Sequence, residues 1–470
     1  MDTGTKPMND NADTVHVTRD LLVRYDKPGP RYTSYPTAPE WQEEFTQADY
    51  RRALADAATR PLEALSVYVH IPFCHERCIY CGCNVVVTAK AGVADHYLDY
   101  LDSEMALAAA ALKDRRRVMQ LHWGGGTPTY LDVPQIERLM ETIRRHFEFP
   151  EGAELALEID PRVTTEEQIF RLRELGFNRV SMGVQDLNPE VQRAITRYQT
   201  EEETRDVYGW CRKAGFGGIN FDLVYGLPFQ RPESWENTIR AICEMRPDRL
   251  AVYSYAHVPW IRPHQKWIPG EALPVGPEKY ELFAAARSKL QAAGYQAIGM
   301  DHFALPEDEL AMALSERRLH RNFMGYSVIP ASEMISFGTS AIGEIGGAYA
   351  QNQVKLSKYY EALDAGEFPT ARGFALTEDD LIRRWLIRRL MCDFYLDTAE
   401  LERRFGIRYN EYFASEEEAL TEFYENQFIA RDGGNLTVLP LGRVFIRNVA
   451  MVFDAHLKKP EGHRMFSRTV

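Results

Sequence analysis

The chain has no uninterrupted apolar run long enough to span a lipid bilayer. Residues 1–20 are polar and lack the apolar core of a signal peptide. Low-complexity segments and short tandem repeats are also missing. These absences argue against a secreted or membrane-spanning protein, and we expect the protein to be cytoplasmic.

Positive charge is in deficit. The 470 residues include 55 Lys and Arg against 68 Asp and Glu, which gives a net charge of −13 at pH 7. An acidic surface repels the phosphates of nucleic acids and the headgroups of anionic lipids. We therefore expect neither nucleic acid nor a membrane as partner, and an anionic substrate would need a local basic pocket.

Cysteine is infrequent and unevenly distributed. The total of seven is odd, which argues against a disulfide framework in a cytosolic protein. Cys211, Cys243 and Cys392 are isolated, and we expect them to be small buried apolar side chains. The other four fall within ten residues, from Cys74 to Cys83, and this clustering is typical of metal ligands.

Apolar runs and amphipathic stretches alternate from Leu65 onward. Strands are predicted at Leu65–His70, Met119–Trp123, Glu154–Asp160, Arg179–Val184, Gly218–Tyr225 and Arg249–Tyr255. Helices are predicted at Val93–Leu112, Val133–Phe147, Glu166–Leu175, Glu201–Lys213 and Trp235–Met245. Six strands alternating with helices indicate an α/β fold of parallel βαβ units, either a barrel or an open doubly wound sheet.

The two ends of the chain follow other patterns. Residues 1–63 are predicted to be an N-terminal extension, in which the prolines of Lys27–Ala38 prevent a continuous helix and favour an extended strap that carries aromatic side chains across another surface. Residues 64–369 form the predicted central domain, and residues 370–470 a mainly helical, winged-helix-like domain. Its predicted elements are helices at Leu381–Met391, Thr398–Phe405, Ser415–Asn426 and from Leu441, and a hairpin at Phe428–Val438 with a Gly-Gly turn.

The strongest chemical signal is the segment Tyr68-Val-His-Ile-Pro-Phe-Cys-His-Glu-Arg-Cys-Ile-Tyr-Cys-Gly-Cys-Asn84. Cysteines spaced by four and three residues can present three thiolates to one iron–sulfur cluster. A 4Fe–4S cluster usually takes four, so three would leave one iron open. Cys83 could by geometry be the fourth ligand of a structural cluster. A zinc site is disfavoured because the chain lacks a second suitably spaced Cys or His pair.

Cys74, Cys78 and Cys81, with the aromatic Tyr80 before the last, give a Cys-x3-Cys-x2-Cys pattern that resembles the signature of radical S-adenosylmethionine (SAM) enzymes. The glycine-rich run Gly124–Thr129 after the second predicted strand resembles the next motif of these enzymes. Other motifs resemble the oxygen-independent coproporphyrinogen III oxidases: Arg31–Thr37, His70–Cys74, Gly82–Asn84, Gly299–Ala304, Leu319–Tyr326 and Phe466–Arg468. The similarity extends from about residue 20 to the C-terminus.

The resemblance implies a fold, a cluster and a cofactor. The implied fold is a partial (βα)6 TIM-like radical SAM barrel with an N-terminal extension and a mainly helical C-terminal domain. Cys74, Cys78 and Cys81 would hold a 4Fe–4S cluster whose open iron binds SAM. One-electron reduction would then cleave SAM into methionine and a 5′-deoxyadenosyl radical. Gly124–Gly126 would let the backbone approach the methionine part closely.

The resemblance also implies two SAM molecules, one on the cluster and one beside it. The implied contacts of the first are Tyr68, Gly125, Glu158 and Ile342. The implied contacts of the second are Tyr80, Gly126, Thr127, Gln185, Arg197, Asp222 and Ala256. Carboxylates suit ribose hydroxyls and an arginine suits a methionine carboxylate. Tyr68 and Cys83 are the expected catalytic residues, and we hypothesise that Cys83 assists the reaction or the final electron transfer.

The implied reaction belongs to haem biosynthesis in the absence of oxygen. Two of the four propionates of coproporphyrinogen III each lose carbon dioxide and two electrons, which leaves the vinyl groups of protoporphyrinogen IX. Candidate cations for the propionates are Arg31, Arg262, His264, Lys266, His302, His320 and Arg321. The enzyme would be a monomer that receives electrons from a flavodoxin or ferredoxin type of donor.

Two other functions within the same superfamily remain as alternatives. A haem-trafficking protein would bind haem without turning over a porphyrinogen, but such relatives generally lack the Gly82–Asn84 continuation and the Arg31–Tyr35 stretch that are present here. A radical methyltransferase would release S-adenosylhomocysteine, whereas decarboxylation releases methionine and 5′-deoxyadenosine.

Overall fold

The computed structural model describes residues 17–328, 333–457, 466 and 468. The chain divides into two compact units. One, the helical unit, comprises the described residues of Met1–Pro39, Val275–Val328 and Glu378–Val470, and the other, the sheet unit, comprises those of Glu40–Pro274 and Ile329–Thr377. None of the helices in the described ranges is both long and apolar enough to cross a membrane. Domain boundaries at residues 63 and 369 stay a prediction.

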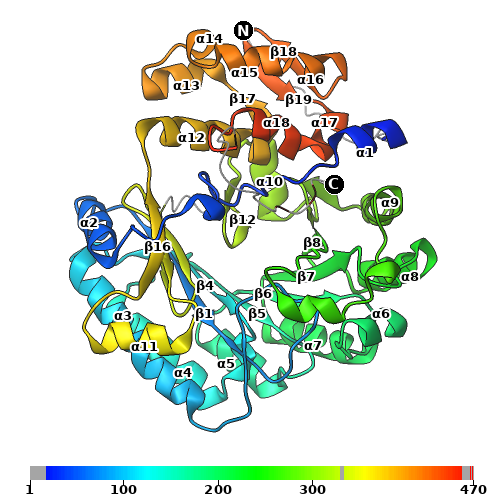
Figure 1. The fold of residues 1–470 in the computed structure, drawn as a ribbon. Coiled ribbons are helices and arrows are strands. Elements are labelled where there is room, and N and C mark those ends of the chain that lie inside the picture. Colours follow the sequence, from blue (N-terminus) through cyan, green and yellow to red (C-terminus); the bar gives the residue numbers. More distant parts are fainter. Residues whose placement is uncertain (1–16, 329–332, 458–465, 467, 469–470) are drawn as a thin grey trace. The chain divides into compact units, whose positions relative to one another are not determined.

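All six predicted strands are present and lie parallel in one sheet (Figure 1). They are β1 (Leu65–Ile71), β4 (Val118–Gly125), β5 (Glu154–Ile159), β6 (Arg179–Gln185), β7 (Gly218–Tyr225) and β8 (Arg249–Ser254). Each pairs with the next in the order β1, β4, β5, β6, β7, β8. The strands are largely apolar because both faces of a parallel sheet are covered by other parts of the protein. The α/β prediction is confirmed.

Helices connect these strands as predicted and pack against one another along one side of the sheet (Figure 1). They are α3 (Val93–Leu112), α4 (Val133–His146), α5 (Glu166–Glu174), α7 (Glu201–Ala214) and α8 (Pro232–Met245). Capping boxes begin α4, α5 and α7, since Asp132, Thr165 and Thr200 each exchange hydrogen bonds with the residue three positions later. The short helix α6 (Pro189–Ala194), which Asn188 caps, was not predicted.

The sheet continues beyond β1 with strands that were not predicted. β13 (Glu333–Phe337) pairs parallel to β1, and β14 (Ile342–Ile345), β15 (Ala348–Asn352) and β16 (Thr370–Ala375) follow as an antiparallel meander. Two further helices of the sheet unit are α2 (Gln47–Ala57) and α11 (Leu356–Asp364). The order within this unit is therefore β16-β15-β14-β13-β1-β4-β5-β6-β7-β8.

The helical unit contains the predicted C-terminal elements. Its helices are α1 (Arg19–Tyr25), α9 (Pro277–Ala292), α10 (Glu309–Ser315), α12 (Glu378–Asp393), α13 (Thr398–Phe405), α14 (Tyr409–Tyr412), α15 (Ala414–Ala419), α16 (Thr421–Glu425), α17 (Pro440–Val444) and α18 (Ile446–Val452). Its strands are β9 (Gln296–Ile298), β10 (His302–Ala304), β11 (His320–Asn322), β12 (Gly325–Ser327), β17 (Tyr395–Leu396), β18 (Ile429–Asp432) and β19 (Asn435–Val438). The predicted hairpin is confirmed as β18–β19. The prediction of a single helix at Ser415–Asn426 is wrong, because the helical conformation is interrupted at Leu420 between α15 and α16.

The proline-rich N-terminal segment is part of a core and not a strap on a surface. Tyr32 and Tyr35 are buried in the hydrophobic cluster of the helical unit. The Tyr32 hydroxyl donates to Asp454 Oδ2 at 2.9 Å, and the Ala455 N–H donates to the Tyr35 hydroxyl at 3.1 Å. The tyrosines therefore contribute apolar burial and satisfied polar groups together.

A buried carboxylate connects α3 to the strands beyond β1. Glu104 is 2% exposed and accepts hydrogen bonds from the Gly338 N–H at 2.8 Å, the Asn352 amide at 2.6 Å and the Tyr359 hydroxyl at 2.6 Å. Because all three donors are neutral, their hydrogen bonds offset only part of the free-energy cost of burying the ionised carboxylate. Burial raises the pKa of Glu104 to about 7.

This shift predicts a pH dependence of stability. The folded protein holds the Glu104 proton more tightly than the unfolded chain does, so the free energy of unfolding falls as the pH rises from about 4.5 to about 7. The effect is at most on the order of 3 kcal/mol. Thermal melts of the wild type and Glu104→Gln over this range test it, because the variant loses this pH dependence. Parallel curves for the two proteins would contradict the assignment.

Candidate active site

The four clustered cysteines lie on or next to a loop that two short strands close. β2 (Phe73–Cys74) pairs parallel with β3 (Val86–Val87), and the Val86 N–H donates to the Pro72 carbonyl at 2.7 Å. The chain between them, which we call the cysteine loop, comprises residues 75–85. β2 follows directly on β1, so the loop begins at the carboxyl end of a parallel strand. Ligand sites of parallel α/β sheets form at this edge.

The cysteine loop borders a cavity of about 610 Å³ at the carboxyl ends of the strands. Of the predicted site residues, the cavity is lined by Cys74, Cys78, Tyr80, Cys81, Cys83, Gly125, Gly126, Thr127, Glu158, Gln185, Arg197 and Asp222. The cavity is also lined by Arg162, Ser181 and Tyr253, for which the sequence predicted no role. Tyr68, Ala256 and Ile342 are not among the lining residues. The structure thus brings most of the predicted set together around one space.

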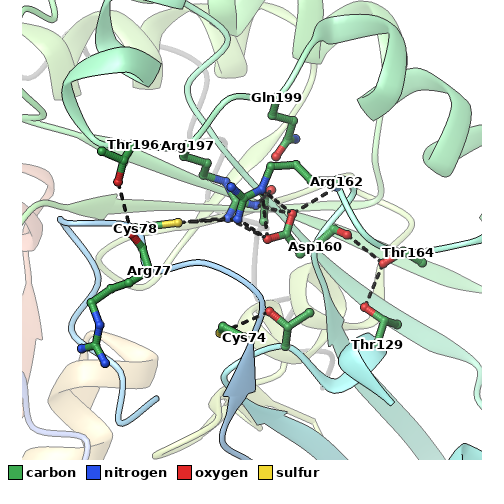
Figure 2. Close-up of polar contacts among 12 residues, drawn as sticks. Cys74, Arg77, Cys78, Thr129, Asp160, Arg162, Thr164, Thr196, Arg197 and Gln199 are labelled. Atoms are coloured by element: carbon green, nitrogen blue, oxygen red, sulfur yellow. Dashed lines mark hydrogen bonds and ion pairs between the residues drawn. The ribbon is translucent and has the colours of Figure 1, made fainter. Parts of the chain in front are cut away.

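A buried ion-pair network stands beside Cys78 (Figure 2). Asp160 accepts hydrogen bonds from Arg162 Nη2 at 2.6 Å and from Arg197 Nη1 and Nη2, both at 3.1 Å. Burial opposes ionisation of Asp160, but the two guanidinium groups hold its pKa below its usual range. The same groups approach Cys78 Sγ at 3.6 Å and 3.7 Å. They would stabilise a thiolate ligand at that position.

The glycine run makes space for the protein's own groups. A Cβ on Gly124 would lie 2.8 Å from Glu158 Oε1, one on Gly125 would lie 2.5 Å from the His70 ring, and one on Gly126 would lie 2.7 Å from the Phe73 carbonyl oxygen. Gly125 also has a φ of +112°, which other residues rarely adopt. The glycines therefore permit the close packing of β1, β4 and β5, and the expected approach of a cofactor to this backbone stays a prediction.

Tyr68 lies behind Glu158 and is held by two histidines. His70 Nε2 is 3.0 Å from the Asn84 carbonyl, which can only accept, so Nε2 carries the proton and Nδ1 accepts from the Tyr68 hydroxyl at 3.1 Å. The Tyr68 ring stacks on His122, whose Nε2 is 3.3 Å from Glu158 Oε1. Burial lowers the pKa of His70, which keeps the ring neutral. Tyr68 is thus fixed in orientation.

The donor set fits an iron–sulfur cluster. Three of the cysteines at the cavity, Cys74, Cys78 and Cys81, have the spacing discussed above, and two cations face Cys78. Hydrogen bonding by Cys83 lowers the pKa of Cys81 to about 7, whereas burial raises that of Cys74 to about 11, so metal binding would have to displace the Cys74 proton. Among the described residues no three His, Cys, Asp or Glu side chains are grouped to hold one metal ion. A cluster instead takes one thiolate per iron.

The SAM contacts expected at the cavity also have a chemical fit. Arg197 Nε is buried and, within the described ranges, has no hydrogen-bond partner, so its N–H can donate to an acceptor group of a ligand. Asp222 accepts from Ser181 Oγ at 2.8 Å and from the Asn220 amide at 2.9 Å, which fixes its carboxylate at the cavity wall. Gln185 has a φ of +67°, a strained conformation that is often found at functional sites.

The predicted propionate cations fall into both units. Within the sheet unit His264 donates from Nε2 to the Cys81 carbonyl at 2.8 Å, so it supports the cysteine loop. In the helical unit burial lowers the pKa of His320 to about 4, with contributions from Arg388 and Arg389, and His320 is therefore uncharged at neutral pH. Arg321 donates to the Arg31 carbonyl. His320 thus differs from the cationic role expected of it.

Removing the Asp160 carboxylate from the ion-pair network beside Cys78 should destabilise the sheet unit. Asp160→Asn leaves two guanidinium groups without their carboxylate, and we expect a loss of about 3 kcal/mol in the free energy of unfolding. Denaturant titration measures it. Asp114→Asn, at an exposed position, is the matched control and should change the value by less than about 0.5 kcal/mol. Equal effects of the two substitutions would contradict the network's role.

Comparison with known proteins agrees with this geometry. Residues 68–242 match the Radical SAM superfamily, and residues 376–445 match the HemN C-terminal domain. The chain is 43% identical to an oxygen-independent coproporphyrinogen III oxidase of Synechocystis sp. over 97% of this chain and 99% of the relative. It is 45% identical to the Escherichia coli protein of that name over 96% of this chain and 98% of the relative.

A solved structure extends the agreement to the fold. The coproporphyrinogen III oxidase HemN of Escherichia coli, described as a radical SAM enzyme, superposes with a TM-score of 0.87 at 44% identity. The match covers 91% of this chain and 97% of HemN. Full-length identity of this level and a cysteine-lined cavity at the strand ends lead to one conclusion. The chain belongs to the oxygen-independent coproporphyrinogen III oxidases, a family of the radical SAM superfamily.

Proposed function

We propose that this protein converts coproporphyrinogen III into protoporphyrinogen IX by oxidative decarboxylation. The observation that supports this most is the full-length identity of 40–45% with relatives that carry the name of that activity. Each reacting propionate, –CH2–CH2–COO⁻, becomes –CH=CH2 and CO2, and it gives up one hydrogen atom and one electron. When bound, the 4Fe–4S cluster and SAM supply the 5′-deoxyadenosyl radical that takes the hydrogen atom. A one-electron acceptor takes the electron.

The residues around the cavity would bind, orient and shield the reactants. Cys74, Cys78 and Cys81 would each hold one iron, with the guanidinium groups beside Cys78 offsetting the negative charge. Glu158, fixed by the Gly125 N–H at 3.2 Å and by His122, would accept from a ribose hydroxyl. Tyr68 would orient the reactants from behind Glu158, because its hydroxyl is held by His70.

The finer assignments belong to the same proposal. One SAM molecule would contact Tyr68, Gly125, Glu158 and Ile342, and a second Tyr80, Gly126, Thr127, Gln185, Arg197, Asp222 and Ala256. A flavodoxin or ferredoxin type of protein would supply electrons to a monomeric, cytoplasmic enzyme. Haem trafficking and radical methyl transfer are not favoured, because full-length relatives carry the oxidase name.

An anaerobic turnover assay tests the reaction. The reconstituted protein receives coproporphyrinogen III, SAM and dithionite, and chromatography follows the porphyrin and 5′-deoxyadenosine. We expect protoporphyrin (after oxidation of the product) and 5′-deoxyadenosine to accumulate together. Release of 5′-deoxyadenosine without any vinyl product, from protein with full iron content, would overturn the substrate assignment. S-adenosylhomocysteine as the product would indicate methyl transfer instead.

Substitution of the fourth cysteine separates cluster binding from catalysis. Cys83 is exposed, and its N–H donates to Cys81 Sγ at 3.4 Å. We expect Cys83→Ser to retain cluster iron and lose decarboxylation, whereas Cys81→Ser should lose the cluster. Iron analysis and the turnover assay measure both properties. If Cys83→Ser loses its iron as Cys81→Ser does, Cys83 is a ligand and the proposed role is wrong.

A further inference from the structure

The outer side of the cysteine loop is fixed to the segment that follows α6. The Ile79 N–H donates to the Ile195 carbonyl at 3.1 Å, and the Thr196 hydroxyl donates to the Arg77 carbonyl at 3.2 Å. The side chain of Arg77 points away from Asp160 and its two guanidinium partners (Figure 2). Arg77 is exposed. Its Nη2 donates to the Val85 carbonyl at 3.2 Å and it lines the cavity, so Arg77 belongs to the cysteine loop itself.

A second segment, which follows β8, holds the other end of the loop. The Gln265 amide donates to the Tyr80 carbonyl at 2.8 Å, next to the His264 hydrogen bond to the Cys81 carbonyl. Gln265 is 1% exposed, and its Oε1 accepts from the Val258 N–H at 2.6 Å. Residues 258–265 are thus connected through two hydrogen bonds to the main chain that carries two of the predicted cluster ligands.

These three segments form one continuous piece of the sheet unit. Ile79 and Tyr80 of the cysteine loop pack against a buried cluster that contains Ile195 and Ile268. The hydrogen bonds above join the same segments at the backbone. The segments that follow α6 and β8 are therefore joined directly to the cysteine loop.

The exposed side chains of these segments are of an unusual kind. Trp260, Ile261 and Trp267 are 50%, 56% and 80% exposed, although large apolar residues are usually buried. Exposed cations accompany them. We name the set of Arg193, Trp260, Ile261, Lys266 and Trp267 the cluster-loop surface. Exposed aromatic and basic residues grouped in this way are typical of binding surfaces for proteins.

The charge of this surface is opposite to that of the whole chain. Among the exposed side chains of residues 193–198 and 260–267, the charged ones are Arg193 and Lys266, and both are cations. The chain as a whole has a net charge of −13. A local excess of positive charge within an acidic protein orients an acidic partner toward that surface.

We propose that the cluster-loop surface is the docking site of an acidic one-electron carrier protein that reduces the cluster. The proposal rests on the proposed function, in which the cluster receives an external electron. The reduced carrier is oxidised by one electron, and the cluster, bound through Cys74, Cys78 and Cys81, is reduced by one electron. No bond forms between the proteins. Weak electron-transfer complexes use small interfaces, which a group of three apolar side chains with cations around them can supply.

A protein partner suits this surface better than the porphyrinogen does. Small-molecule sites are concave and bury most of their ligand. Trp267, at 80% exposed, extends into solvent instead, and neither Trp260 nor Trp267 lines the cavity of the sheet unit. Tryptophan and arginine are the residues that most often dominate the binding energy of protein interfaces.

Charge reversal on this surface separates carrier docking from chemistry. The variant Arg193→Glu/Trp267→Glu is compared with Lys358→Glu, which reverses an exposed cation on α11 outside the surface. Anaerobic stopped-flow mixing of the reconstituted holoenzyme with reduced flavodoxin follows the absorbance of the oxidised cluster. At low salt we expect the double variant to be reduced at least about tenfold more slowly, with a weaker dependence on ionic strength. Lys358→Glu and the wild type should react alike.

Chemical reduction is the second arm of the experiment. With dithionite in place of flavodoxin, the double variant should be reduced, and should form protoporphyrinogen, at the wild-type rate. The milder Arg193→Gln/Trp267→Gln serves if charge reversal lowers iron content, and it should give an intermediate rate with flavodoxin. Equal flavodoxin rates in all proteins would overturn the proposal. Normal flavodoxin rates with a raised KM for coproporphyrinogen III would assign the surface to the substrate and also overturn it.

The two proposals fail in different ways. If the proposed function is wrong, wild-type protein reduced by dithionite cleaves SAM but yields no vinyl product. If only the docking proposal is wrong, dithionite supports full turnover and flavodoxin reduces the double variant as fast as the wild type.

Discussion

Parallel alignment of β1 with β4–β8 is the constraint on which the site depends. Because all six strands run in one direction, their carboxyl ends lie at one edge, and residues far apart in sequence meet there. Cys74 comes from the end of β1 and β2, Gly125 from β4, Glu158 from β5 and Asp222 from β7. The short pairing of β2 with β3 then holds the cysteine loop at this edge. Any one strand running in the opposite direction would remove its residues from the cavity.

The second constraint is the cost of burying charge near the cavity. Asp160 and the two arginines beside it are each largely buried, and they are stable there because each charge has a partner. Their arrangement also leaves cations at the Cys78 sulfur, where a cluster ligand requires positive surroundings. Glu104 is the opposite case, a buried carboxylate that neutral donors satisfy. Its partners lie on β15, α11 and the turn after β13, so it connects the antiparallel strands to α3.

Much of the fold could be predicted from the sequence, because long apolar runs and helices with capping residues leave clear periodic patterns. Gly218–Tyr225 and Val93–Leu112 have the predicted bounds. Strands β13–β16 were missed, since they are short and lie in a region without such a pattern. The cysteine cluster and the polar residues at the strand ends could be predicted, because the spacing of these residues along the chain indicates their chemical role. The Asp160–Arg197 pair and the Gln265 contact could not, because they join residues that are 37 and 185 positions apart, and the Gln265 contact depends on a backbone carbonyl. The glycine run was predicted to be functional, but its packing against His70 and Glu158 depends on three-dimensional contacts.

The central claim is that a radical formed at this cavity removes hydrogen from a propionate of coproporphyrinogen III. The most direct measurement uses coproporphyrinogen III deuterated at the propionate carbon attached to the pyrrole, under anaerobic turnover. Mass spectrometry of the 5′-deoxyadenosine then reports the source of the transferred hydrogen. Our account predicts one deuterium in the 5′-deoxyadenosine for each vinyl group formed. Unlabelled 5′-deoxyadenosine together with protoporphyrin would contradict it, because the hydrogen would then come from another position or from solvent.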